Sequence, residues 1–117
     1  MEGQVKQSTQ LGTELTVLER LVLLNVLPKE GDFTTLKLVR KLREDLSFDE
    51  DEHKKLAFVQ DGGQVRWNEK VNLTKRIMIG KKQTDIIQKT LKKLNDEKKL
   101  TDNHYSLYEK FVDSPQS

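Results

Sequence analysis

The sequence has no cysteine, only two prolines and few aromatic residues, and these scarcities exclude several classes of protein. Without cysteine the chain can form no disulfide scaffold, no thiolate metal site and no cysteine nucleophile. No apolar run approaches the ~20 residues that a membrane-spanning helix needs. Residues 1–12 lack the apolar core of a signal peptide and the Arg-rich pattern of a transit peptide. We therefore expect a cytoplasmic protein without a membrane partner.

The length and composition fit one small domain. The chain has 117 residues, of which 34% are apolar and 34% are charged, and its mean hydropathy is −0.73. Domains of roughly 100–150 residues are the commonest size, and a chain of this length can bury a real core. We expect a single globular domain over 13–112, with disordered tails at 1–12 and 113–117.

The charges are distributed unevenly along the chain. Residues 1–61 have a net charge of −3, residues 62–100 have a net charge of +7, and residues 101–117 have a net charge of −2. This asymmetry indicates either an anionic partner or an electrostatic match between an acidic cluster at 44–52 and the basic segment 62–100.

Hydrophobic periodicity predicts five helices. Thr16 and Glu19 have capping-box spacing, Thr34 or Thr35 can cap a second helix, and Ser47 with Glu50 repeats the box. Pro28 ends the first helix. The helices are expected at about 15–27, from the Thr34–Thr35 cap to 46, from the Ser47 cap to 56, at 84–99, and from a cap at Thr101 to 112.

Alternating residues predict a small antiparallel sheet. The turn 61–63 (Asp-Gly-Gly) separates two short strands at 57–60 and 64–68, and a third strand fits 75–79. Val65 and Trp67 should face the core. The fold class is therefore α+β, with about five helices and a sheet made of the hairpin plus one strand. The element order is also winged-helix-like, but four carboxylates at 49–52 make groove reading by the third helix unfavourable.

Two further packing expectations come from the helical stripes. The first helix is apolar almost all round, which is typical of a central helix or of an oligomer interface. The last helix should dock on the core through one stripe, formed by Tyr105, Tyr108, Phe111 and Val112.

The catalytic inventory is small. The only histidines are His53 and His104, and the candidate nucleophiles Ser47 and Ser106 lack a nucleophile-elbow pattern. Asp49 and His53 could share a helix face, but two ligands make a weak metal site. We expect no enzyme activity, no metal site and no cofactor.

The basic segment offers the best anion-binding surface in the sequence. Gly80 followed by lysines at a helix start has the form of an anion site, although a phosphate loop needs a second glycine. A lysine stripe on the fourth helix, beside a hairpin that carries an arginine, can follow a phosphate backbone. The tentative nucleic-acid or anion-binding residues are Arg66, Lys81, Lys82, Lys89, Lys92 and Lys93.

Three phrases of the sequence resemble small accessory proteins of bacteriophages and prophages that have no assigned function. They are LTVLERLVLLNVLP, VQDGGQVRWN and LTDNHYSLYEKF. The resemblance implies a short cytoplasmic protein that binds a host or viral partner. The principal hypothesis is thus a non-catalytic module acting through protein–protein contacts, with an unknown partner or a second copy of itself. The alternative is a nucleic-acid-binding protein that uses a basic face of residues 66–99.

Overall fold

The computed structural model describes residues 12–113 and has an α+β fold, which confirms the expected class. The predicted tails lie outside these residues, apart from Gly12 and Asp113. No helix in the described range is long and apolar enough to cross a membrane. The elements, in chain order, are β1 (Thr13–Thr16), α2 (Val17–Val26), α3 (Phe33–Leu46), α4 (Glu50–Leu56), β2 (Val59–Asp61), β3 (Gln64–Arg66), β4 (Thr74–Ile77), α5 (Lys81–Asp96) and α6 (Asp102–Phe111).

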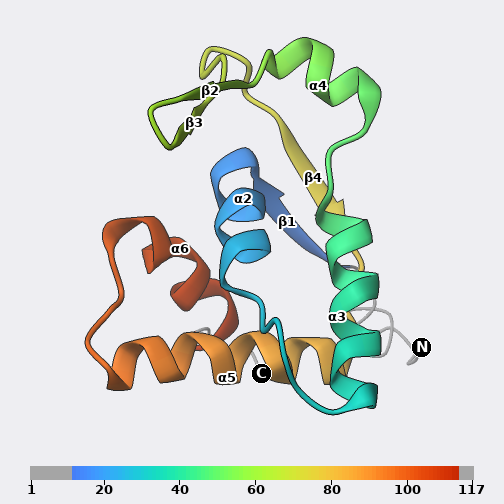
Figure 1. The fold of residues 1–117 in the computed structure, drawn as a ribbon, viewed down its shortest axis with the longest axis vertical. Coiled ribbons are helices and arrows are strands. Elements are labelled where there is room, and N and C mark those ends of the chain that lie inside the picture. Colours follow the sequence, from blue (N-terminus) through green and yellow to red (C-terminus); the bar gives the residue numbers. More distant parts are fainter. Residues whose placement is uncertain (1–11, 114–117) are drawn as a thin grey trace, which may run out of the picture.

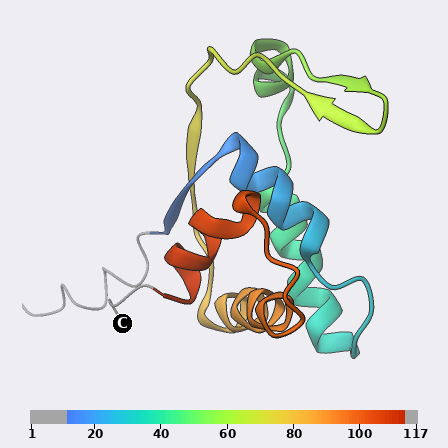
Figure 2. The same cartoon turned by 90° about the vertical axis from the view of Figure 1, so that its left-hand side faces the viewer.

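The molecule divides into a body and an arm (Figure 1). The body contains β1, α2, α3, β4, α5 and α6. The arm contains α4 and the β2–β3 hairpin, and it lies at the opposite end of the long axis from α5. Figure 2 shows the same separation after a quarter turn. The arm follows α3 in the chain and leads into β4, so two chain segments connect it to the body.

The strands form two separate sheets and not the single sheet that the sequence predicts. In the body, β1 pairs antiparallel with β4, from Thr13 opposite Ile77 to Thr16 opposite Thr74. In the arm, β2 pairs with β3. The predicted third strand is present, but it pairs with β1, a strand that the sequence did not predict and whose last two residues lie in the range predicted as the first helix.

The core lies between the helices of the body and the β1–β4 ribbon. Leucines dominate it, because the helices α2, α3, α5 and α6 each turn one apolar stripe inward. Burying such side chains is the main favourable term in folding. The core members are Leu15, Leu23, Leu27, Val39, Leu42, Leu46, Ile77, Ile87, Leu91, Leu107 and Phe111.

The first helix begins at Val17 and not at Leu15. The expected capping box is confirmed, since Thr16 Oγ1 accepts from the Glu19 N–H at 3.1 Å and Glu19 Oε1 accepts from the Thr16 N–H at 2.9 Å. Thr16 itself is extended, with φ −82° and ψ 172°. A capping residue has to be extended, so Leu15 stays in β1.

Two further predicted caps are wrong by a few residues. Asp32 caps α3, because its carboxylate accepts from the Thr35 N–H at 2.8 Å and so precedes the predicted threonine caps. Asp49 and Glu52 form the capping box of α4, in place of Ser47 and Glu50. In both cases an aspartate, a strong N-cap residue, outcompetes the expected hydroxyl.

Helix α5 also differs from its prediction at both ends. It begins at Lys81 after Gly80, whose N–H donates to Gln83 Oε1 at 2.9 Å. It ends at Asp96, three residues before the predicted end at Lys99. Lys98 has φ 57°, a left-handed conformation that terminates the helix.

The predicted inward orientation of Val65 and Trp67 is wrong. Val65 is 41% exposed and Trp67 is half-buried. The turn has positive φ at Gly62 and Gly63, as a tight hairpin requires, but the hairpin projects in the arm instead of covering the core. Alternation shows that two residues share a face of a strand, not what that face meets.

The last helix docks through a different stripe from the one predicted. Tyr105 is 64% exposed, whereas Leu107, which the stripe omitted, is fully buried. Phe111 belongs to the core as expected, and Tyr108 and Val112 pack against it. Leu107 and Phe111 are four residues apart, and this spacing sets the buried face of α6.

Candidate functional site

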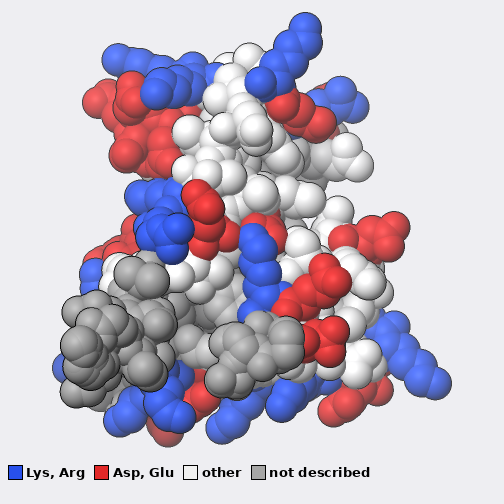
Figure 3. All heavy atoms as spheres, turned by 180° about the vertical axis from the view of Figure 1, so that it is seen from behind, with Lys and Arg blue, Asp and Glu red and all other residues white. Residues whose placement is uncertain are grey.

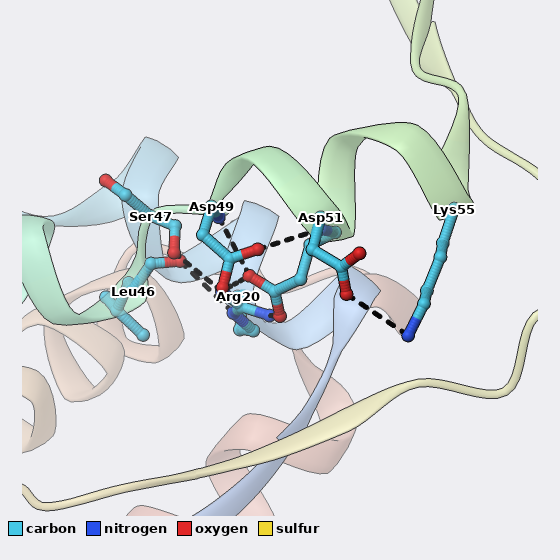
Figure 4. Close-up of polar contacts among 7 residues, drawn as sticks. Arg20, Leu46, Ser47, Asp49, Asp51 and Lys55 are labelled. Carbon is cyan, nitrogen blue, oxygen red and sulfur yellow. Dashed lines mark hydrogen bonds and ion pairs between the residues drawn. The ribbon is translucent and has the colours of Figure 1, made fainter.

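One buried arginine joins the arm to the body. Arg20 on α2 is 1% exposed. Its Nη1 and Nη2 donate to the Glu52 carboxylate at 2.7 and 3.1 Å, and its Nε and Nη2 donate to the Leu46 and Ser47 carbonyls at 3.1 and 2.7 Å (Figure 4). This pairing with a planar guanidinium satisfies both carboxylate oxygens. The hydrogen bonds from Arg20 hold the pKa of Glu52 below its usual range, against the effect of burial.

An aromatic chain continues from Arg20 into the arm. The Arg20 guanidinium lies 3.8 Å from the centre of the Phe48 ring. The rings of Phe48 and Phe58 are 5.0 Å apart, and those of Phe58 and Trp67 are 6.3 Å apart. These separations suit edge-to-face and tilted aromatic packing. The arm therefore has its own small aromatic cluster, which joins the segment after β3 to the segments before and after α4.

A groove of about 1120 Å³ separates the arm from α2. On the body side it is lined by Val17, Leu18, Leu21, Val22 and Asn25 of α2. These positions follow helical spacing, so they form one face of the helix. Leu18 is 37% exposed, and Leu21 and Val22 are half-buried. The helix that the sequence shows as apolar all round therefore has two apolar faces, one in the core and one along this groove.

The arm side of the groove is the edge of β3. Residues 63–67 all line the groove, whereas no residue of β2 does. Asp61 pairs with Gln64 across the two-residue turn, and Gln60 pairs with Val65. In this register the Val65 N–H and C=O point away from β2. The groove thus combines an unpaired strand edge with an apolar helix face.

The charges of this groove balance, and the rest of its polar lining is neutral. Arg66 and Glu69 contribute one charge of each sign, and Arg66 Nε also lies 3.6 Å from an Asp61 carboxylate oxygen. The neutral lining consists largely of amide side chains, which both donate and accept hydrogen bonds. They are Asn25, Gln64, Asn72 and Asn103.

The structure does not bring the predicted basic residues together on one face. Five of them, Lys81, Lys82, Lys89, Lys92 and Lys93, are exposed along α5. Arg66 is in the arm, at the other end of the long axis (Figures 1 and 2). The expectation that the arginine lies beside the lysine stripe is therefore wrong, because the hairpin lies across the groove from α2 and not near α5.

The acidic cluster at 44–52 forms ion pairs with cations on α2, α3 and α4. Asp45 pairs with Lys41 at 3.0 Å, Asp51 with Lys55 at 3.2 Å, and Glu52 with Arg20. Within residues 12–113, no ion pair connects this cluster to the lysines of α5. Acidic and basic side chains are interspersed on the face shown in Figure 3.

Three of the candidate catalytic residues, His53, His104 and Ser47, make local contacts. His104 Nδ1 accepts from the Thr101 N–H at 2.9 Å, and Ser47 Oγ donates to the Arg43 carbonyl at 2.6 Å. His53 lies 5.4 Å from Phe58 between ring centres. Across the described part of the chain, no group of three or more histidines and carboxylates is placed to hold a metal ion.

Neither the buried contacts of Arg20 with Glu52 nor the groove was predicted from the sequence. One signal was available: Glu19 and Arg20 are charged residues inside an otherwise apolar helix, and charges in such positions are buried only when they are paired. Comparison of the chain with models of known protein families, with curated proteins and with solved structures finds no match.

Proposed function

We propose that this protein is a non-catalytic binding module whose groove between α2 and β3 accepts an extended segment of a partner protein. The observation that carries the proposal is that one groove is lined both by the apolar stripe of α2 and by β3, whose outer edge pairs with no other strand of residues 12–113. A peptide added to a sheet edge gains main-chain hydrogen bonds, and adjacent pockets select its side chains.

The lining defines the chemistry of the segment. Leu18, Leu21 and Val22 favour apolar side chains, which gain by leaving water. The balanced charges and the amide groups favour a segment without net charge, since its main-chain groups can bond to the amides. A partner strand paired with Val65 would alternate its side chains between the two faces of the hairpin sheet.

This role also bears on cofactors, location and partner. A module that binds a protein segment needs no cofactor and no catalytic set. We place it in the cytoplasm, with a host or viral partner, in keeping with the resemblance of its sequence phrases to bacteriophage accessory proteins.

Selected peptides and amide exchange test the groove. A library of random twelve-residue peptides would be displayed and selected on the whole protein. Hydrogen–deuterium exchange would then be measured with and without a selected neutral peptide. We expect slower exchange of the Val65 amide, because a paired strand protects it. The Gln60 amide, on the outer edge of β2, serves as the internal control.

A matched pair of substitutions identifies the face that binds. Val65→Asp places a charge in the groove, whereas Val59→Asp places the same charge on β2, which does not line the groove. Both residues are exposed, at 41% and 56%. We expect Val65→Asp to weaken neutral-peptide binding about tenfold or more and Val59→Asp to leave it unchanged. Equal effects, or no protection of Val65, would refute the groove.

Nucleic-acid binding is the second candidate, supported by the exposed lysines of α5. Lys89, Lys92 and Lys93 take part in no ion pair within residues 12–113. Binding of duplex DNA would fall linearly with salt on logarithmic axes. We expect Lys89→Glu with Lys92→Glu to weaken it, and Lys54→Glu with Lys55→Glu on α4 to do so less. Identical behaviour of the two variants would exclude the α5 surface.

A further inference from the structure

A second exposed surface, distant in sequence from the groove, centres on the start of α3. Phe33, the first residue of the helix, is 79% exposed. It lines a shallow depression of about 820 Å³ together with Pro28, Leu36 and the buried Val39. Exposing so much of a phenylalanine to water costs free energy, and a partner that covers the ring would recover it. Exposed apolar surface with a polar rim is typical of an interaction site.

Cations surround this apolar surface. The rim contains five basic side chains, Lys29, Lys37, Arg40, Lys41 and Arg43, and one carboxylate, Glu44. We call Phe33, Leu36, Lys29, Lys37 and Arg40 the Phe33 patch.

Three of the five cations have no ionic partner among residues 12–113. Lys41 pairs with Asp45 at 3.0 Å, and Arg43 donates to the Leu24 carbonyl at 3.2 Å. Within residues 12–113, no ion pair includes Lys29, Lys37 or Arg40. These three charges are free to attract an acidic partner.

We propose that the Phe33 patch binds an acidic segment of a partner protein in which a large apolar side chain lies between aspartates or glutamates. Phe33 and Leu36 would contact the apolar side chain, while Lys37 and Arg40 pair with the flanking carboxylates. Positions 33, 36, 37 and 40 follow helical spacing, so they lie along one side of α3. Arginine forms bidentate pairs with carboxylates, and such pairs favour an acidic peptide.

The patch fits a protein segment better than it fits a nucleic acid. Phosphates follow one another without a gap along a strand, and Glu44, one helical turn beyond Arg40, would repel the phosphate that follows. A peptide has discrete carboxylates and can avoid this position. The apolar floor of the depression also gives an apolar side chain a place to bind, whereas a phosphate backbone gains nothing from it.

The same selected peptide library tests this surface separately from the groove. Peptides that depend on Phe33 should contain two or more acidic residues and at least one large apolar residue. Phe33→Ala should weaken their binding about tenfold or more, as expected for a central aromatic contact. The control is Tyr105→Ala, because Tyr105 is a similarly exposed aromatic residue, at 64%, on α6.

Charge reversal separates a local site from general attraction. Lys37→Glu with Arg40→Glu should weaken the acidic peptides at least ~tenfold. Lys92→Glu with Lys93→Glu on α5 makes the same change in net charge and should have a much smaller effect. Variants of exposed residues on the helix surface should fold normally, and unfolding by urea would verify this.

The outcomes are distinguishable. The proposal is overturned if no acidic peptide is selected, if Phe33→Ala and Tyr105→Ala bind equally well, or if both charge reversals have the same effect. It is also overturned if duplex DNA, and not the peptide, shows the dependence on Phe33. Loss of acidic peptides in Val65→Asp would assign them to the groove between α2 and β3 instead.

Discussion

Replacing Arg20 by alanine should destabilise the protein more than any surface substitution. The change removes every hydrogen bond that Arg20 makes to Glu52, Leu46 and Ser47. It leaves the Glu52 carboxylate, whose side chain is 11% exposed, without its cation. Removing one partner of a buried ion pair costs about 3–5 kcal/mol, and we expect Arg20→Ala to lower the free energy of unfolding by that amount.

Equilibrium unfolding in urea measures this free energy. Trp67, the only tryptophan, lies in the arm and so provides a fluorescence signal for the part that Arg20 anchors. The matched control is Asp51→Ala, since the pair of Asp51 with Lys55 is exposed, at 73% and 57%. Exposed pairs contribute about 0–1 kcal/mol.

The pH dependence gives an independent check of the same pair. The pKa of Glu52 is lowered in the folded protein from its ordinary value of 4.5, so the unfolded chain binds the proton more tightly. The stabilisation from Glu52 is therefore present above pH 4.5 and is lost as the pH falls below it, through the folded pKa. Arg20→Ala should reduce this acid sensitivity. If Arg20→Ala lowers the free energy of unfolding by no more than about 1 kcal/mol beyond Asp51→Ala, the Arg20–Glu52 pair does not hold the arm on the body.

Three further predictions concern the arm, the body and the β1–β4 ribbon. Trp67→Ala should cost about 1–2 kcal/mol in urea unfolding, less than a fully buried tryptophan, because the side chain is half-buried. Lys110→Met should cost about 2–4 kcal/mol, because Lys110 Nζ donates at 2.7 Å to Glu19, which is 2% exposed. Gly12→Ala should lower the melting temperature, because φ is +85° and the added Cβ would lie 2.7 Å from the Ile77 carbonyl oxygen. A variant that melts with the parent protein would contradict the last of these.

The Glu19 pair also predicts a pH dependence in the body. Burial raises the pKa of Glu19, but hydrogen bonds from Lys110 and Ser106 outweigh this effect and hold the pKa below its ordinary value of 4.5. The stability from Glu19 is therefore present above pH 4.5 and is lost below it. Lys110→Met should reduce that loss in acid urea titrations, and an unchanged acid profile would refute the pairing.

Local sequence signals predicted most helices and strands, because helix caps and turns form between neighbouring residues. The capping box of Thr16 and Glu19, the cap at Thr101 and the Gly62–Gly63 turn all form from residues within a few positions of one another. The α+β class followed from them. Where several cap residues competed, as before α3 and α4, the prediction missed by a few residues, because each candidate alone satisfies the same N–H groups.

Strand pairing and the groove depended on contacts between distant residues. Thr16 pairs with Thr74, and Arg20 with Glu52, across long stretches of chain. No periodicity within one segment shows which distant strand or carboxylate completes such a contact. For the same reason, alternation in the hairpin could not reveal that Val65 would face a groove and not the core.

The sequence by itself determined the approximate positions of the helices and of the hairpin turn, since these follow from backbone preferences and from the side-chain spacing of nearby residues. Only the tertiary structure decided that the second apolar face of α2 lines a groove, that β3 lies on the other side of this groove, and that Arg66 lies far from the α5 lysines. Those arrangements depend on a buried ion pair and on packing across the whole chain. The two surfaces that we propose as binding sites are therefore recognisable only in three dimensions.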